Sequence, residues 1–334
     1  MRARRLLVPL LMVLMLLTAC ASTPDAKGQA SAAPKAGTGA QAGAVPSPPL
    51  PEKLKKTNGN GVPMLKVYVV DDKSVKEMDI ETYLQGVLAG EMKNDWPMEA
   101  LRAQAILART FVLKFTTEKQ SKYQGADIST DIEEAQAYNA ADVNDRVKQA
   151  VSSTKGMVLS SNGEFPYAWF HAHSGGKTAL AKEGLGYEKE EPPYTTSVAG
   201  QESDKAPADA KTWDASFSQA EFLKACKDAG ASISSAKSVS IGKKGESGRA
   251  VTLSVDGQEV DAVRLRIALG STKMRSTLLT SVSVKGGKIA MSGKGFGHGV
   301  GMPQWGAYGL AEGGMKGEEI VLQYFKNVQV ISMW

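Results

Sequence analysis

Hydrophobic and polar positions follow two different periods along the chain, and the two periods occur close together. Residues 65–70 (LKVYVV) alternate with period two, which predicts a strand, and residues 71–73 predict a turn into a second strand. Residues 79–92 carry apolar side chains at helical spacing behind an aspartate that can cap a helix. A second helix is expected from Pro97, with a stripe of core positions down to residue 115.

The rest of the chain continues this mixture. Residues 157–161 and 165–171 flank Asn162-Gly163, the typical turn of a β-hairpin, so we expect these two segments to pair. A capping box at residues 218–221 predicts the start of another helix. Three more strands are expected, at residues 250–255, 278–284 and 288–292. Because no regular βαβ rhythm appears, the sequence predicts an α+β fold, either as one large mixed domain or as two lobes around a groove.

The N-terminal residues have the pattern of an export signal. Three arginines precede an apolar run at residues 6–17, which is too short to span a bilayer comfortably, so residues 1–19 are interpreted as a signal peptide. Cys20 follows Leu-Thr-Ala, which resembles the lipobox of bacterial lipoproteins and implies a lipid anchor on its sulfur; the alternative is an ordinary signal peptide. Residues 20–62, rich in Ala, Gly, Pro and Ser, are expected to be a flexible linker to a folded domain at 63–334.

Charge and cysteine content exclude two other classes of protein. The chain has 40 Lys and Arg against 35 Asp and Glu, and removal of the signal removes three arginines, so the mature protein is only weakly basic. A nucleic-acid partner is therefore not expected. After lipidation only Cys226 remains, which rules out an intramolecular disulfide framework. Cys226 lies in a helical pattern and is expected to be a buried hydrophobe.

Glu91 is the first candidate for chemistry. It continues the apolar face of the 79–92 helix, where partial loss of water would raise its pKa toward that of a useful general acid. The alternative is a glutamate at a helix terminus that points into water beside Lys93.

The three histidines all lie next to glycine-rich turns, which favours a shared site over a role as core residues. His171 and His173 are two apart on a predicted strand and so point to the same face, while His298 lies in the segment 295–301 (GFGHGVG). That segment lacks the spacing of a nucleotide-binding loop. The amide and aromatic side chains of residues 302–309 suit sugar rings, although a glycine-packed core turn has a similar composition.

Three segments together resemble the signatures of the sporulation stage II protein D/LytB family. The first is residues 83–92 (YLQGVLAGEM) with 96–105 (WPMEALRAQA), the second is 170–178 (FHAHSGGKT), and the third is 297–307 (GHGVGMPQWGA). Their order and spacing agree with the family over about residues 64–331.

The resemblance implies a peptidoglycan lytic transglycosylase, which cleaves between N-acetylmuramic acid and N-acetylglucosamine and leaves a 1,6-anhydro end. Glu91 falls on the family's catalytic glutamate. One carboxyl group is enough for this reaction, since the 6-hydroxyl of the sugar itself is the nucleophile, and no cofactor is expected. From their chemistry we assign substrate binding to a further set of residues. Trp305 is expected to serve as a platform for the sugar, Ser174 is included in the set, and the expected hydrogen-bond donors are His171, Lys177, His298 and Gln304.

The sequence departs from some spore-forming relatives at a zinc site. Tyr123, Ser129 and Ala135 stand where those relatives carry one histidine and two cysteines, and these side chains cannot replace that ligand set. We therefore expect no structural zinc there and a groove held by packing instead.

Two other functions stay open at this stage. The family also includes proteins described as amidase enhancers, in which the chain would bind glycan or an amidase without cleaving. A third alternative is a zinc hydrolase with His171, His173 and His298 as ligands and Glu91 as base. The expected partners are glycan strands, the membrane through lipidated Cys20, and a cell-wall amidase. The expected location is the outer face of the bacterial cytoplasmic membrane.

Overall fold

A computed structural model describes residues 46–334 and shows two lobes, each with its own hydrophobic core. The predicted signal peptide, the lipidated Cys20 and most of the predicted linker lie outside the described residues. Helices mix with several small sheets, so the α+β prediction is confirmed.

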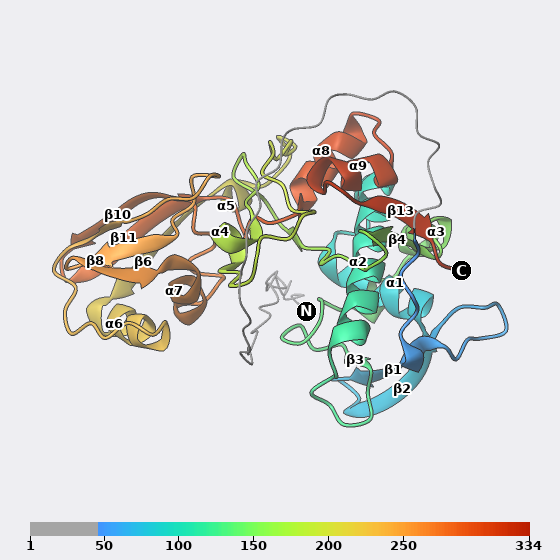
Figure 1. The fold of residues 1–334 in the computed structure, drawn as a ribbon. Helices are drawn as coiled ribbons and strands as arrows, with labels where there is room; N and C mark the ends of the chain where they lie inside the picture. Colours follow the sequence, from blue (N-terminus) through green and yellow to red (C-terminus); the bar gives the residue numbers. More distant parts are fainter. Residues whose placement is uncertain (1–45) are drawn as a thin grey trace, which may run out of the picture.

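The first lobe is built around two adjacent helices (Figure 1). Helix α1 (Ile80–Glu91) begins where predicted, with the Asp79 carboxylate accepting a hydrogen bond from the Thr82 N–H. Helix α2 (Met98–Glu118) follows Pro97 and buries the predicted apolar stripe. The hairpin of β1 (Met64–Val69) and β2 (Ser74–Asp79) feeds directly into α1, so the predicted order of elements holds here.

The C-terminal part of the chain returns to this first lobe and packs on α2. The other elements of the lobe are η1 (Glu52–Leu54), β3 (Ile128–Ser129), η2 (Ala140–Asp142), α3 (Asp145–Ser153), β4 (Met157–Ser160), α8 (Gln304–Glu312), α9 (Gly317–Tyr324) and β13 (Gln329–Ser332). The antiparallel pairing of β4 with β13 joins segments more than 150 residues apart. A periodicity in sequence cannot identify such a partner.

The predicted hairpin around Asn162-Gly163 is only partly correct. The tight turn exists, with a bridge between Ser161 and Glu164 and positive φ angles at Asn162 and Gly163. Residues 165–169, however, do not pair with β4, whose partner is β13. The short strand β5 (Phe170–His171) instead pairs in parallel with β12 (Met302–Pro303), because the chain leaves the first sheet after the turn.

The second lobe packs two helices against antiparallel strands (Figure 1). Its elements are β6 (Thr212–Ser218), α6 (Gln219–Asp228), β7 (Val239–Ile241), β8 (Thr252–Val255), β9 (Gln258–Asp261), α7 (Ala262–Leu269), β10 (Leu279–Lys285) and β11 (Lys288–Lys294). The capping box forms, since the Ser218 hydroxyl accepts from the Glu221 N–H. Cys226 is fully buried in this lobe's core, which confirms its predicted place.

The segment between the lobes has little regular structure. It includes α4 (Ala181–Leu185) and α5 (Ala208–Lys211), and the parallel β5–β12 pair lies at its first-lobe end. Two separate crossings of the chain, near residues 170–212 and 294–303, therefore join the lobes.

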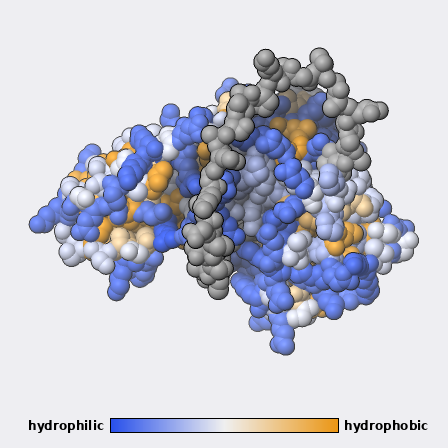
Figure 2. All heavy atoms as spheres, viewed as in Figure 1, coloured by the Kyte–Doolittle hydropathy of each residue, from blue (hydrophilic) through white to orange (hydrophobic). Residues whose placement is uncertain are grey.

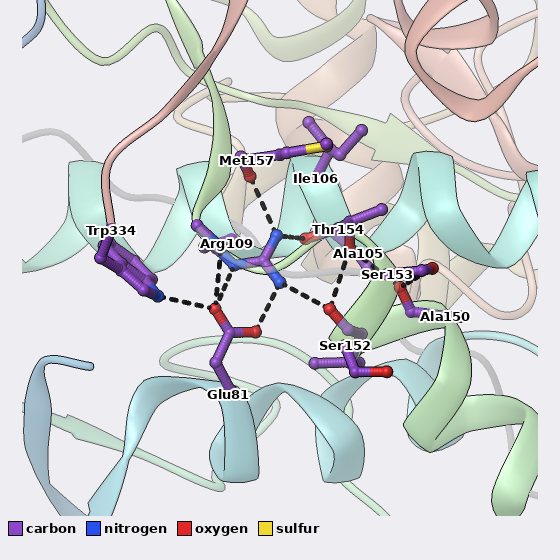
Figure 3. Close-up of polar contacts among 12 residues, drawn as sticks. Glu81, Ala105, Ile106, Arg109, Ala150, Ser152, Ser153, Thr154, Met157 and Trp334 are labelled. Atoms are coloured by element: carbon purple, nitrogen blue, oxygen red, sulfur yellow. Dashed lines mark hydrogen bonds and ion pairs between the residues drawn. The ribbon is translucent and has the colours of Figure 1, made fainter. Parts of the chain in front are cut away.

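A buried ion pair fixes the position of α1 relative to α2 (Figure 3). Arg109 of α2 is fully buried and its Nη2 lies 2.6 Å from Glu81 Oε2. The Trp334 indole N–H and the Gly156 N–H both donate to Glu81 Oε1, at 3.0 and 3.1 Å. Arg109 also donates to the Met157 carbonyl at 2.9 Å. Every charged atom of the pair is thus hydrogen-bonded, as burial of charge requires.

The visible outer surface of both lobes is mainly hydrophilic, with apolar residues in separate small patches (Figure 2). Within residues 46–334 no helix combines the length and the apolar composition needed to cross a membrane.

Candidate active site

A cleft of about 600 Å³ is lined by residues of both lobes. The first lobe and the connecting segment supply Glu91, Phe111, Gln136, Trp169, His171, His298 and Gln304, among others. The second lobe supplies residues at the end of α6 and along one side of α7, including Asp228, Val263, Arg264 and Ile267. The predicted groove therefore exists, and Glu91 lies in its wall.

Glu91 is the last residue of α1, and two neighbours hold its carboxyl group. Its Oε1 accepts a hydrogen bond from the Ala137 N–H at 2.7 Å. The Gln304 amide Nε2 donates to the Glu91 carbonyl at 3.0 Å and lies 3.5 Å from Oε2. Burial raises the pKa of Glu91 to about 7, against the opposing effect of these two hydrogen bonds. A carboxyl group with this pKa can donate a proton near neutral pH and accept it back.

The approach of residues 136–138 to Glu91 depends on a glycine in α1. A Cβ atom at Gly90 would lie 2.6 Å from both the Ala137 carbonyl carbon and the Tyr138 nitrogen. No ordinary side chain fits there, so the Gly-Glu pair in the first signature has a geometric reason. Gly90 leaves room for the backbone of residues 137–138, and Glu91 is the candidate acid.

The segment that leads to residues 136–138 contains the three positions where some relatives carry zinc ligands, and other contacts hold it here. Tyr123 stacks on Tyr68 with ring centroids 3.9 Å apart, and its hydroxyl donates to Asp131 Oδ2 at 2.6 Å. The Tyr83 hydroxyl donates to the Ser129 carbonyl at 2.9 Å. Ala135 is buried in the core and lines the cleft. Aromatic stacking and hydrogen bonds hold this segment.

His171 and His298 both line the cleft, and the backbone of Val300 determines how each presents its ring. The Val300 N–H donates to His298 Nδ1 at 2.9 Å, while His171 Nδ1 donates to the Val300 carbonyl at 3.1 Å. The ring centroids are 5.6 Å apart. Burial, with further effects of nearby positive groups, lowers the pKa of both histidines well below the ordinary value, so both are neutral near pH 7.

The structure brings only part of the predicted substrate-binding set to the cleft, namely His171, His298 and Gln304. Ser174 is buried, and its backbone N–H and hydroxyl both donate to Glu202. Lys177 is exposed elsewhere, and its ammonium donates to the Glu246 carbonyl at 3.2 Å. Neither of these two side chains lines the cleft. Gly175 and Gly176, both with positive φ angles, turn the chain between Ser174 and Lys177.

Trp305 also lies away from the cleft lining. Its ring packs against Trp96 at a centroid distance of 4.4 Å and against Tyr308 at 5.2 Å, which makes a separate aromatic cluster. As the second residue of α8, Trp305 points to a different side of the helix from Gln304.

An aromatic wall of the cleft was not anticipated from the sequence. Tyr167 and Trp169 stack at a centroid distance of 5.0 Å, and Tyr187 meets Trp169 edge-on at 5.9 Å. All three line the cleft. The signal was present in the alternation of residues 167, 169 and 171, which puts both rings on the same side as His171 in an extended chain.

The three histidines do not come together as metal ligands. His173 is outside the cleft lining, and its Nδ1 accepts from the Gly175 N–H at 2.9 Å with Glu202 Oε1 3.6 Å away. Across residues 46–334, no group of three or more His, Cys, Asp and Glu side chains is arranged to hold a metal ion. The geometry therefore gives the zinc-hydrolase alternative no ligand set in this part of the chain.

Comparison with known proteins gives two family matches on separate parts of the chain and several relatives that cover most of it. Residues 70–160, which contain Glu91, match the family described as Stage II sporulation protein, and residues 189–301 match a Domain of unknown function (DUF8618). An uncharacterized protein of Brachyspira hyodysenteriae is 32% identical over 259 residues, which cover 77% of this chain and 68% of that protein. Stage II sporulation protein D of Bacillus amyloliquefaciens is 29% identical over 278 residues, covering 79% and 77%. The amidase enhancer of Bacillus subtilis is 28% identical over 293 residues, covering 75% of this chain and 40% of that protein.

Proposed function

The chain belongs to the stage II sporulation protein D/LytB family, and on that premise we propose that it is a lytic transglycosylase of bacterial cell-wall peptidoglycan. One observation carries the proposal: Glu91, a carboxyl group with a pKa of about 7, lies in the wall of a cleft large enough for sugar rings. A group that is half protonated near neutral pH suits the two proton transfers of this reaction.

In the proposed reaction the protonated Glu91 gives its proton to the glycosidic oxygen as the bond to the muramic acid carbon breaks. The 6-hydroxyl of the same muramic acid then bonds to that carbon and returns a proton to the Glu91 carboxylate. One bond breaks, one forms, and no water is consumed. The Ala137 N–H and the Gln304 amide orient the carboxyl group through both steps.

The other carboxylates of the cleft support the use of a single catalytic carboxyl group. Glu188 and Asp228 also line the cleft, but both are exposed and paired with a cation. Glu188 lies 2.7 Å from Arg264 and Asp228 lies 2.6 Å from Lys224. An inverting or retaining hydrolase would need one of them as base or nucleophile, whereas a transglycosylase needs neither.

The aromatic wall fits the faces of pyranose rings. Tyr167, Trp169 and Tyr187 present apolar area, while Gln304 and the histidines supply polar contacts. Sites for small ligands commonly have such a mainly apolar lining with a few polar groups that fix orientation.

A second candidate function is that of an amidase enhancer, which binds glycan and an amidase without cleaving. The observation that favours it is the similarity to the Bacillus subtilis amidase enhancer over 75% of this chain. In either case we propose that the protein is exported and held on the outer face of the cytoplasmic membrane through Cys20, with the linker reaching toward glycan strands.

The test is mass spectrometry of purified glycan strands after incubation with the protein or with Glu91→Gln. We expect anhydromuramyl ends from the wild type and none from Glu91→Gln, which should still bind glycan. Glu188→Gln and Asp228→Asn should continue to yield anhydro ends, because the proposed reaction needs one carboxyl group.

Each alternative has its own result. Reducing ends that disappear in Glu188→Gln or Asp228→Asn would indicate hydrolysis. If neither peptide-free nor peptide-bearing strands are cleaved, while added amidase is stimulated, the enhancer function is correct and the transglycosylase proposal is wrong.

A further inference from the structure

Two buried acceptor atoms in the cleft wall have no hydrogen-bond partner within the described residues. They are Gln136 Oε1 and His171 Nε2, and the two side chains are 1% and 2% exposed. Both residues line the cleft that contains Glu91. Buried polar atoms are almost always paired, so two unpaired acceptors on residues that line one cleft point to a ligand.

The chemistry of His171 Nε2 follows from the other side of its ring. Nδ1 lies 3.1 Å from the Val300 carbonyl oxygen, which can only accept, so Nδ1 must carry the hydrogen. Burial and the neighbouring positive charges keep the imidazole neutral by lowering its pKa. In a neutral ring with a protonated Nδ1, Nε2 is a pure acceptor. This corrects the prediction from the sequence that His171 would donate to the substrate.

The orientation of the Gln136 amide is fixed in the same way. Its Nε2 lies 3.5 Å from the Ala108 carbonyl oxygen. Turning the amide over would bring two carbonyl-type oxygens together, so Oε1 is the atom without a partner.

Both acceptors are linked closely to the groups that hold Glu91. Gln136 directly precedes Ala137, whose N–H binds Glu91 Oε1. His171 is the register partner of Pro303, which directly precedes Gln304, the other residue that contacts Glu91. Both acceptors therefore belong to the two chain segments that contact Glu91, and they line the same cleft.

We propose that Gln136 and His171 are positioning residues that accept hydrogen bonds from hydroxyl or acetamido N–H groups of a neutral sugar. The proposal rests on the proposed function and names the part of the substrate that this wall recognises. Two unpaired acceptors favour a neutral, donor-rich group and disfavour a carboxylate at the same place, since an anion would bring a further acceptor to them.

Two substitutions remove the acceptors while keeping the rest of each contact. His171→Asn retains an N–H near the position of Nδ1 and deletes Nε2, and Gln136→Leu replaces the amide with an apolar side chain of similar size. The matched control is Gln104→Leu. Gln104 is a fully buried glutamine of α2 whose two polar atoms are also unpaired, but it does not line the cleft.

Binding and turnover are measured separately on peptide-free glycan strands. With the Glu91→Gln protein as background, His171→Asn and Gln136→Leu should each weaken glycan binding about tenfold, as expected for the loss of one hydrogen bond. With Glu91 intact, KM should rise by a similar factor while the pH profile of kcat stays in place, because the Ala137 and Gln304 contacts are unchanged. Gln104→Leu should change neither measurement. If the two residues only supported the fold, their loss would not raise KM while leaving the pH profile of kcat unchanged.

The outcomes separate this inference from the proposed function. Unchanged binding and KM in both folded variants, with anhydro products still formed, would overturn the acceptor pair and leave the transglycosylase proposal intact. Glycan binding that weakens in both variants, without any cleavage by the wild type, would support the acceptor pair and refute the transglycosylase. Absence of glycan binding in the wild type would overturn both.

Discussion

Gly90→Ala tests whether the acid depends on the close approach of residues 136–138. The substitution adds one methyl group on α1, immediately before Glu91. That methyl would lie 2.6 Å from the Ala137 carbonyl carbon and from the Tyr138 nitrogen, and 2.8 Å from the Ala137 oxygen. Carbon contacts are favourable only at about 3.5–4.0 Å, so this backbone segment must move away by about 1 Å.

Two opposing contributions decide the effect on stability. Alanine in place of glycine in a helix favours folding by about 1 kcal/mol. Overpacking against backbone costs about 1–3 kcal/mol, since backbone cannot rotate aside as a side chain does. We therefore expect a net loss of up to about 2 kcal/mol in the free energy of unfolding, which a domain of ordinary stability survives.

The effect on chemistry should be larger. The bond from the Ala137 N–H to Glu91 Oε1 is 2.7 Å long and would open to about 3.7 Å, beyond the range of a hydrogen bond. Because this bond favours the charged carboxylate, its loss should raise the pKa of Glu91 further above its present value of about 7. Displacement of a catalytic group by about 1 Å can lower the rate about 100-fold.

The assay follows anhydromuramyl product from glycan strands over a range of about pH 5 to 9, together with urea unfolding. In the wild type the rate should fall as pH rises through about 7, where Glu91 loses its proton. In Gly90→Ala the rate should be lower throughout, and its decline should move to higher pH. Gly59→Ala is the control, because nothing lies within 4 Å of the added methyl and its φ is not positive.

One result would refute the reasoning. If Gly90→Ala folds, cleaves glycan at the wild-type rate and keeps the same alkaline limb, the Ala137 contact is unimportant for Glu91 and the glycine has no catalytic consequence.

Three further predictions concern stability and reactivity. Because the pKa of Glu91 is raised from 4.5 to about 7, the protonated group stabilises the fold below pH 4.5, and this contribution is lost as pH rises through 7. At pH 8 the free energy of unfolding of Glu91→Gln, measured with urea, should therefore exceed that of the wild type by about 2–3 kcal/mol, and the difference should be smaller at pH 5. Arg109→Ala should lower the free energy of unfolding by about 3–5 kcal/mol, because it leaves the largely buried Glu81 carboxylate without its cation, whereas Lys56→Ala at an exposed pair should cost under about 1 kcal/mol. Cys226 is buried and its thiol pKa is raised to about 11, so in a Cys20→Ser protein a thiol reagent should label it only after denaturant is added; rapid labelling in buffer would contradict its placement.

Local structure followed from the sequence wherever neighbouring residues decide it. The Asp79 cap, the apolar stripe of α2, the Ser218 capping box and the burial of Cys226 all depend on spacing of a few residues, which periodicity and capping chemistry describe directly. The position of Glu91 on a mostly apolar helix face likewise predicted a raised pKa, and the structure gives that direction.

These local patterns could not predict which strands pair when the strands lie far apart in the sequence. The turn at Asn162-Gly163 forms, yet β4 pairs with β13 near the C-terminus, because a strand accepts any partner with the right register and hydrophobic face. For the same reason the sequence could not show that β5 pairs with β12 and so sets His171 beside the residue that precedes Gln304.

The sequence by itself determined the local elements, the candidate acid and the family resemblance. Only the tertiary structure decided which candidates share the cleft: Gln304 and His171 face it, while Lys177 and Trp305 do not, and Gln136 enters it without any prior signal. The physical reason is that a side chain's direction depends on backbone turns and on contacts with distant segments. Residue type fixes what chemistry is available, and packing fixes where that chemistry meets a ligand.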